Sequence, residues 1–317
     1  MRSGAFALSL LATPLNVDVL GALQEEPRNL SELRRAAGTP PPTTMRKHLR
    51  TLTDVGAVRR HQEPGFPGTA SFELGPSGAD LLELGQLLED WLGASPEGPL
   101  ALGGSAAKGA LKALIEGWNS RIVRAIAARP LCLTDLNQLI STLNYPSLER
   151  RLSALRFTGL VEACSNGGRS TPYGPGPWLR RAGGVLMAAA HWERRYAAAA
   201  IAGERFDFET AFLLGLPDVS LSPEADGRCR LGVELRNASG ERTWAGVQVE
   251  VESGEIASCL PHPEGEVEAS ASGNSGAWVC ALKEGHPDQL DFSGDRQLAV
   301  EIVDGLHRGF FRVRQAI

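Results

Sequence analysis

The stretch PTTMRKHLRTLTDVGAV, residues 42–58, decides the fold of the first part of this chain. Met45, Leu49 and Leu52 recur within it at helical spacing and predict a helix with one buried face. Gly56 predicts the end of that helix, and residues 57–60 predict a strand. The other face of the helix carries Thr, Lys and Arg side chains, so we expect it to stay exposed.

The flanking segments complete a small domain around this helix. They predict two shorter helices, a proline-rich break, a turn, a returning strand and a final helix, over residues 16–24, 29–33, 38–42, 64–68, 71–74 and 78–92. Three helices followed by a two-stranded ribbon predict a winged helix-turn-helix module, which we place at residues 1–92.

The same pattern returns 103 residues later without a gap. Leu30, Leu33, Met45, Leu49, Leu52, Gly56 and Val58 correspond to Leu133, Leu136, Leu148, Leu152, Leu155, Gly159 and Val161. The polar positions Asn16, Ser31 and Glu32 correspond to Asn119, Thr134 and Asp135. A repeat of this length is a whole domain. We therefore expect a linker over residues 93–108 and a second winged helix-turn-helix module over residues 109–203.

Within the second copy, the expected elements follow the order of the first. They are helices over 118–127, 133–139 and 147–157, a strand over 160–163, a wing loop over 165–170, a short strand at 172–173 and an alanine-rich helix over 178–201.

These motifs resemble known classes of bacterial repressor. Residues 42–58 resemble the recognition helix and following strand of the ArsR and MarR classes, whereas residues 148–161, with Trp118 opening the module, are more similar to the HxlR class. Residues 72–81 resemble the junction between wing and helix of HxlR proteins. The amino-terminal Cys motif of HxlR proteins is absent, and the second junction, at residues 173–178, is degenerate. The resemblance implies a transcriptional regulator that binds double-stranded DNA.

A recognition helix in the major groove needs basic and hydrogen-bonding side chains on its outer face. The candidates for DNA contacts are Thr43, Thr44, Arg46, Lys47, Arg50, Arg59 and Arg60 in the first copy and Ser147, Arg150, Arg151, Arg156 and Arg169 in the second. Because Glu149 stands where the first copy has Arg46, we expect the two copies to read different half-sites, as a built-in pseudo-dimer within a monomer or in a homodimer. Arg and Lys on a solvated helix face are also common without DNA binding. Winged helices can serve as protein-docking modules or persist as a relict fold, and that alternative stays open.

The last third of the chain changes to period-two segments. Residues 229–235, 244–251 and 266–270 predict a meander of antiparallel strands, and residues 275–283 and 295–310 predict two helices. The run from residue 269 to residue 299 resembles sterol-carrier-protein-like domains, which implies an α+β domain over residues 204–317 with an apolar ligand cavity between sheet and helices. The residues proposed to line the cavity are Trp244, Trp278, Phe292, Phe310 and Phe311, with ordinary core packing as the alternative.

The predicted fold class is therefore multi-domain: two winged helix-turn-helix modules, mainly α with a β-wing, followed by the α+β domain. Charge is distributed unevenly over these parts. Residues 97–200 hold 13 basic and 6 acidic residues, whereas residues 201–317 hold 10 basic and 20 acidic residues. This balance favours DNA binding by the modules and disfavours it for the last domain.

The sequence predicts no enzyme, no cofactor and no metal site. We find no catalytic motif, the six His residues lack ligand spacing, and the five Cys residues form no CxxC pair. Cys132 lies where some ArsR repressors hold a thiolate metal site, but a lone thiol predicts a structural role. The composition and the absence of a long apolar run predict a cytoplasmic protein without a membrane span. The alternative function is small-molecule sequestration for self-resistance, with the winged helices as scaffold; a repair enzyme built on tandem winged helices would need catalytic groups that we do not find.

Overall fold

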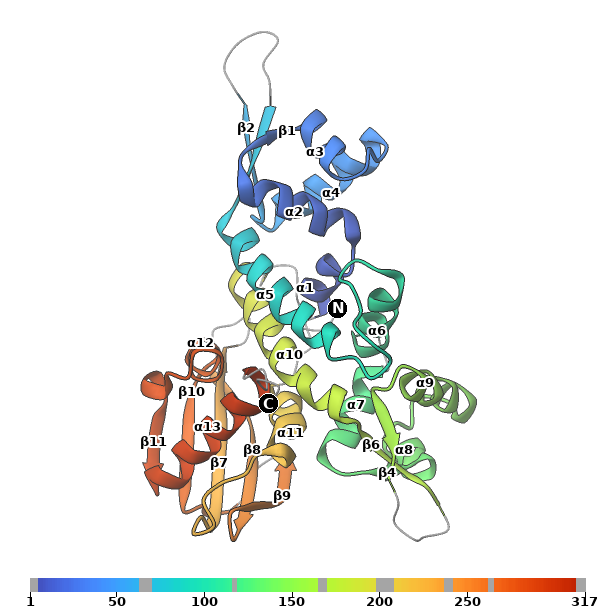
Figure 1. Cartoon of the computed structure of the whole chain (residues 1–317). Helices are drawn as coiled ribbons and strands as arrows, with labels where there is room; N and C mark the ends of the chain where they lie inside the picture. The colour runs from blue at the N-terminus through green and yellow to red at the C-terminus, as the bar shows by residue number, and fades with distance from the viewer. Residues whose placement is uncertain are drawn as a thin grey trace. The chain divides into compact units, whose positions relative to one another are not determined.

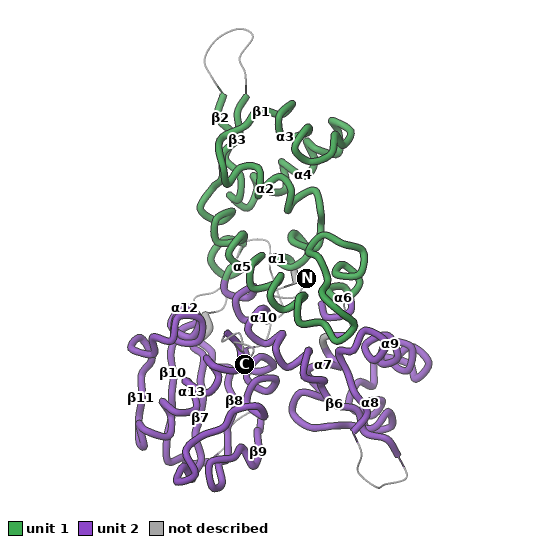
Figure 2. The backbone as a smooth tube through the Cα atoms, in the orientation of Figure 1, with its two compact units in different colours: residues 1–112, 192–204 green, residues 113–191, 205–317 purple. Residues whose placement is uncertain are grey.

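The computed structural model describes residues 5–62, 70–115, 119–164, 170–197, 208–236, 242–261 and 265–311. The chain divides into two compact units, coloured separately in Figure 2. Unit 1 comprises Met1–Lys112 and Trp192–Glu204, and unit 2 comprises Ala113–His191 and Arg205–Ile317.

Unit 1 contains a winged-helix domain at the amino terminus (Figure 1). Its elements are α1 (Ala5–Leu11), α2 (Pro14–Glu25), β1 (Arg28–Asn29), α3 (Leu30–Ala36), α4 (Pro42–Asp54), β2 (Val58–Gln62), β3 (Ala70–Leu74), α5 (Pro76–Gly93) and α6, which starts at Ser105 and ends at Ile115 beyond the unit boundary. The three strands form an antiparallel sheet in the order β1-β3-β2. The helices and the ribbon predicted from residues 16–24, 29–33 and 42–58 are therefore confirmed, whereas α1, α6 and the two-residue β1 were not predicted. The turn predicted at residues 64–68 lies outside the described residues.

The core of this domain forms where the helical spacing placed it. Met45 and Leu52 are 0% exposed and Leu49 is 3% exposed. Leu20 and Leu33, from the two preceding helices, are buried with them. Burial of these side chains fixes which face of α4 remains in solvent.

The end of α10 (Pro177–Tyr196) belongs to unit 1. The indole Nε1 of Trp192 donates to the Ser77 carbonyl of α5 at 2.8 Å. The hydroxyl of Tyr196 donates to Asp80 at 2.7 Å. The Ala7 amide of α1 donates to Glu193 Oε1 at 2.8 Å. These polar contacts therefore hold the last turn of this helix against α1 and α5.

The first half of unit 2 repeats the element order of unit 1. It contains α7 (Asn119–Ala128), β4 (Leu131–Cys132), α8 (Leu133–Leu139), α9 (Tyr145–Phe157), β5 (Val161–Ala163), β6 (Pro172–Pro175) and the greater part of α10. Its sheet order, β4-β6-β5, corresponds strand by strand to β1-β3-β2. The helix predicted over residues 178–201 ends at Tyr196 in the described part of the chain.

The second half of unit 2 is a mixed sheet with helices. It contains α11 (Phe208–Gly215), η2 (Leu216–Asp218), β7 (Gly227–Arg236), β8 (Arg242–Glu252), β9 (Glu255–Pro261), β10 (Ala269–Asn274), α12 (Ser275–Val279), η3 (Cys280–Glu284), η4 (Pro287–Gln289), β11 (Asp291–Gly294) and α13 (Arg296–Phe311). The strand order is β11-β10-β7-β8-β9.

The predicted antiparallel meander is correct only for part of this sheet. Strands β7, β8 and β9 are antiparallel neighbours, but β9 was not predicted. The strand predicted at 266–270 begins at Ala269 as β10 and pairs in parallel with β7. Periodicity identifies strands but does not specify their neighbours, and a parallel pair requires a crossover connection.

Helices α11 and α13 pack on the sheet (Figure 1). Leu231, Val247 and Val249 are fully buried there, as alternation along the strands requires. Trp278 of α12 is also fully buried, with its ring centroid 4.8 Å from that of Phe212 on α11. Among the described residues, no helix is long and apolar enough to cross a membrane.

Candidate nucleic-acid interface

The exposed face of α4 collects most candidate DNA contacts of the first module. Thr43, Arg46, Lys47 and Arg50 are exposed, and Thr44 is half-buried. Pro42 occupies the first turn, where its missing N–H costs no helical hydrogen bond. The result is a helix with an apolar inner face and a cationic outer face that carries hydroxyl groups.

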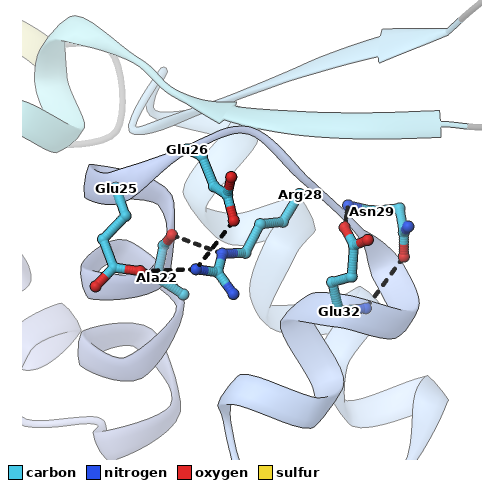
Figure 3. A network of polar contacts seen from close by, with 6 residues as sticks. All are labelled: Ala22, Glu25, Glu26, Arg28, Asn29 and Glu32. Carbon is cyan, nitrogen blue, oxygen red and sulfur yellow. Dashed lines mark hydrogen bonds and ion pairs between the residues drawn. The ribbon is translucent and has the colours of Figure 1, made fainter.

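The preceding helix α3 is held by side chains at its start (Figure 3). The Asn29 side chain accepts from the backbone amides of Ser31 and Glu32 at 2.9 and 3.0 Å, and Glu32 accepts from the Asn29 amide at 2.8 Å. Arg28 lies beside this cap and donates to Glu25 at 2.7 Å and to the Ala22 carbonyl at 3.0 Å. This capping box fixes where α3 leaves β1.

The turn between α3 and α4 is fixed by backbone geometry. Gly38 and Thr39 adopt positive φ angles of 73° and 59°. The Thr39 amide donates to the Arg34 carbonyl at 2.6 Å, and Arg34 Nε donates to the Pro40 carbonyl at 3.0 Å. These contacts determine the direction in which α4 begins.

The ribbon carries Arg59 and Arg60 on neighbouring positions of β2, both exposed. Arg59 lies 3.9 Å from Glu73 on β3, and Nε2 of His61 lies 2.8 Å from the same carboxylate. Glu73 therefore offsets part of the positive charge on one side of the ribbon, a pairing that the sequence did not predict.

The second copy places its candidate residues differently. Arg150 is exposed on α9, and Ser147 is half-buried with its amide donating to the Asn144 side chain at 3.0 Å. The Arg156 guanidinium lies 5.2 Å from the centre of the Tyr173 ring. Arg151 is half-buried and bonded within the fold, and Arg169 lies outside the described residues.

One pair of contacts in this region was missed from the sequence. Asn16 Oδ1 of α2 lies 2.9 Å from Nδ1 of His48 on α4. In the second copy, Nη1 of Arg151 donates to Oδ1 of Asn119 at 3.2 Å. The 103-residue repeat pairs Asn16 with Asn119, and the same offset leads from His48 to Arg151, so the signal was present.

The five aromatic residues proposed for a ligand cavity lie in different places within unit 2. Trp278 is in the core, whereas Trp244, near the start of β8, is 58% exposed. The guanidinium of Arg296 lies 5.0 Å from the Phe292 ring. Phe310 and Phe311 contact each other with ring centroids 6.1 Å apart.

Phe310 also lies close to Gly183 of α10 and Gly215 of α11. A Cβ at either glycine would come within 2.5 Å of the Phe310 ring. Packing against these helices thus accounts for the position of Phe310.

Cys132 has a local role. It is the N-cap of α8, and its thiol lies 2.9 Å from Asp135, which completes a capping box like that of Asn29 and Glu32. The hydrogen bonds with Cys132 lower the pKa of Asp135. Within the described ranges, no group of three or more His, Cys, Asp or Glu residues could hold a metal ion.

Comparison with known proteins gives one family match. Residues 11–61 match the family model described as a helix-turn-helix domain. No curated protein matches the chain. Diamide-treated YodB from B. subtilis is 22% identical, with 27% of this chain and 85% of that chain covered and a TM-score of 0.26. A protein described as a transcriptional regulator of the MarR family from Enterococcus faecalis V583 is 23% identical, with 27% and 78% covered and a TM-score of 0.26. The matched segment runs from the end of α1 through β2, so residues 11–61 of this chain form a helix-turn-helix domain.

Proposed function

We propose that this chain is a DNA-binding transcriptional regulator in which α4 enters the major groove. The observation that carries the proposal is the outer face of α4, where Arg46, Lys47 and Arg50 are exposed within a matched helix-turn-helix domain. Cations on such a helix bind phosphates and base edges, and the buried Met45 and Leu49 keep them pointed outward.

We further propose that the second copy is also a winged helix-turn-helix module and that the two act as a pseudo-dimer. The recurrence of element order, sheet order and capping box supports this proposal. Because Glu149 stands where the first copy has Arg46, the second module would contact a different half-site, about 10 base pairs from the first.

The last domain is proposed to be sterol-carrier-like and to bind an apolar small molecule that regulates DNA binding. Helices α11 and α13 pack on the sheet, and Trp278 lies between the sheet and these helices. This arrangement supports the proposal that the ligand is apolar. Regulation requires that the ligand bind two arrangements of the protein with different affinity.

The salt dependence of duplex binding tests DNA recognition by α4. Fluorescence anisotropy would compare the wild type with a variant that combines Arg46→Ala, Lys47→Ala and Arg50→Ala. If each cation contacts one phosphate, the slope of log affinity against log salt becomes shallower by about 0.9 per residue removed.

The matched control removes three exposed cations elsewhere, by Lys108→Ala, Arg181→Ala and Arg308→Ala. It should keep the wild-type slope. Equal slopes for the two triple variants would contradict DNA recognition by α4, and a wild type that binds only apolar ligands would support the sequestration function instead.

A further inference from the structure

One polar contact at equivalent positions joins α2 to α4 in the first copy and α7 to α9 in the second. Asn16 and Asn119 are buried, with 3% and 5% of their surfaces exposed. Each accepts a hydrogen bond from the recognition helix, from His48 in the first copy and from Arg151 in the second. A buried amide requires such a partner, so the contact also fixes the position of the recognition helix.

The contacts of Asn16 determine which nitrogen of His48 carries the proton. Asn16 Nδ2 donates to the Leu10 carbonyl at 3.0 Å, which leaves Oδ1 directed at His48. Since Oδ1 only accepts, Nδ1 of His48 must donate, and neutral His48 is the Nδ1–H tautomer. A second proton therefore binds Nε2, on the far side of the ring, without breaking the contact with Asn16.

The surroundings of His48 favour its neutral form in the free protein. Burial and, secondarily, the charge of Lys47 lower the pKa of His48. From α2, the group facing it is the neutral amide of Asn16. A phosphate next to Nε2 would act in the opposite direction and raise the pKa of His48.

We propose that His48 is a positioning residue and a phosphate contact at once, so that the first module binds DNA with uptake of a proton whereas Arg151 gives the second module a permanent charge. The inference rests on the proposed function. It identifies pH as a regulator of the α4 surface and assigns a role to a residue outside the cationic face described above.

The direction of the pH effect follows from the two protonation states. DNA binds the protonated form more tightly, so affinity rises as pH falls through the pKa of His48 in the complex. The gain is complete below the pKa that His48 has in the free protein, which burial lowers from its ordinary value. If DNA raises the pKa of His48 by one pH unit, binding becomes up to about tenfold stronger.

The test measures affinity for a mixed-sequence duplex by anisotropy at about pH 5.5 and about pH 8, the range in which histidine titrates. We expect the wild type to bind roughly tenfold more tightly at the lower pH. His48→Arg copies the second module and should bind tightly at both values. His48→Gln keeps a neutral donor for Asn16 and should bind weakly at both values.

His61 on β2 is a second histidine of this domain, exposed and 2.8 Å from Glu73, and His61→Gln is the matched control. It should keep most of the wild-type pH dependence. The inference is overturned if His48→Arg and His48→Gln retain that dependence, or if His61→Gln alone removes it. A wild type that binds no duplex at either pH contradicts the proposed function itself, which separates the two failures.

Discussion

Gly56 and Gly159, 103 residues apart, have the same φ angle of 70°. Gly56 follows α4 and Gly159 follows α9, and the next amide closes each turn: Ala57 donates to the Leu52 carbonyl at 2.8 Å, and Leu160 donates to the Leu155 carbonyl at 3.0 Å. The duplication seen in the sequence thus extends to the backbone at the end of α4 and α9.

Replacing either glycine should destabilise its unit. A side chain in the left-handed region costs about 1–2 kcal/mol, so Gly56→Ala and Gly159→Ala should each lower the free energy of unfolding by about 1 kcal/mol or more. At Gly56 the cause is conformational, because a Cβ there would meet only Ser77 Oγ at 3.9 Å.

Urea unfolding followed by circular dichroism measures this effect. Gly109→Ala is the control, since Gly109 is exposed within α6 and a Cβ there meets nothing within 4 Å. That variant should gain stability, because alanine favours a helix by about 1 kcal/mol over glycine. Equal behaviour of all three variants would contradict the assignment of the two C-terminal turns.

The two capping boxes differ in strength. Asn29 accepts two amides near 3.0 Å, whereas the Cys132 thiol accepts the Asp135 amide at 3.5 Å. Asparagine is among the best N-caps, so Cys132→Asn should stabilise unit 2 by about 1 kcal/mol.

The reciprocal change, Asn29→Cys, should destabilise unit 1 by a similar amount, and thermal unfolding would measure both. If Cys132→Asn lowers the melting temperature, the thiol has a role other than capping.

An ion pair inside unit 2 connects the two halves of that unit. Arg124 Nη2 of α7 lies 2.9 Å from Glu209 Oε2 of α11, and the Glu209 side chain is 5% exposed. Arg124→Ala leaves this carboxylate without that partner and should cost about 1–2 kcal/mol, less than for a fully buried pair because the arginine is 44% exposed.

Arg181→Ala, at an exposed position on α10, is the control for loss of one positive charge. Chemical unfolding should separate the two variants. The ion pair would be dispensable if both variants unfold at the wild-type denaturant concentration.

The sequence alone predicted the helices of both copies because their apolar spacing is regular and their ends carry Pro, Asn or Gly. It missed β9 and the parallel pairing of β10, since strand neighbours depend on contacts distant in sequence. It treated Arg151 as an outward-facing cation, whereas Asn119 draws it inward. Charge alone did not reveal this, but comparison of positions 48 and 151 would have.

The cysteines should differ strongly in reactivity. Burial raises the pKa of Cys229 and of Cys259 to about 12. A thiol alkylates as the thiolate, so at about pH 8 both should react at least roughly 100-fold more slowly than an exposed cysteine with an ordinary pKa.

Iodoacetamide labelling followed by mass spectrometry measures these rates residue by residue. In urea the difference should disappear. Equal rates in the folded protein would show that Cys229 and Cys259 are accessible.

Selection of DNA from a random duplex library with the purified full chain tests the central claim most directly. We expect an enriched motif with two unequal half-sites about 10 base pairs apart, one of which loses its enrichment when Arg46, Lys47 and Arg50 are replaced by Ala. Absence of any enriched motif would contradict DNA recognition, and a motif with two identical halves would contradict the unequal pseudo-dimer.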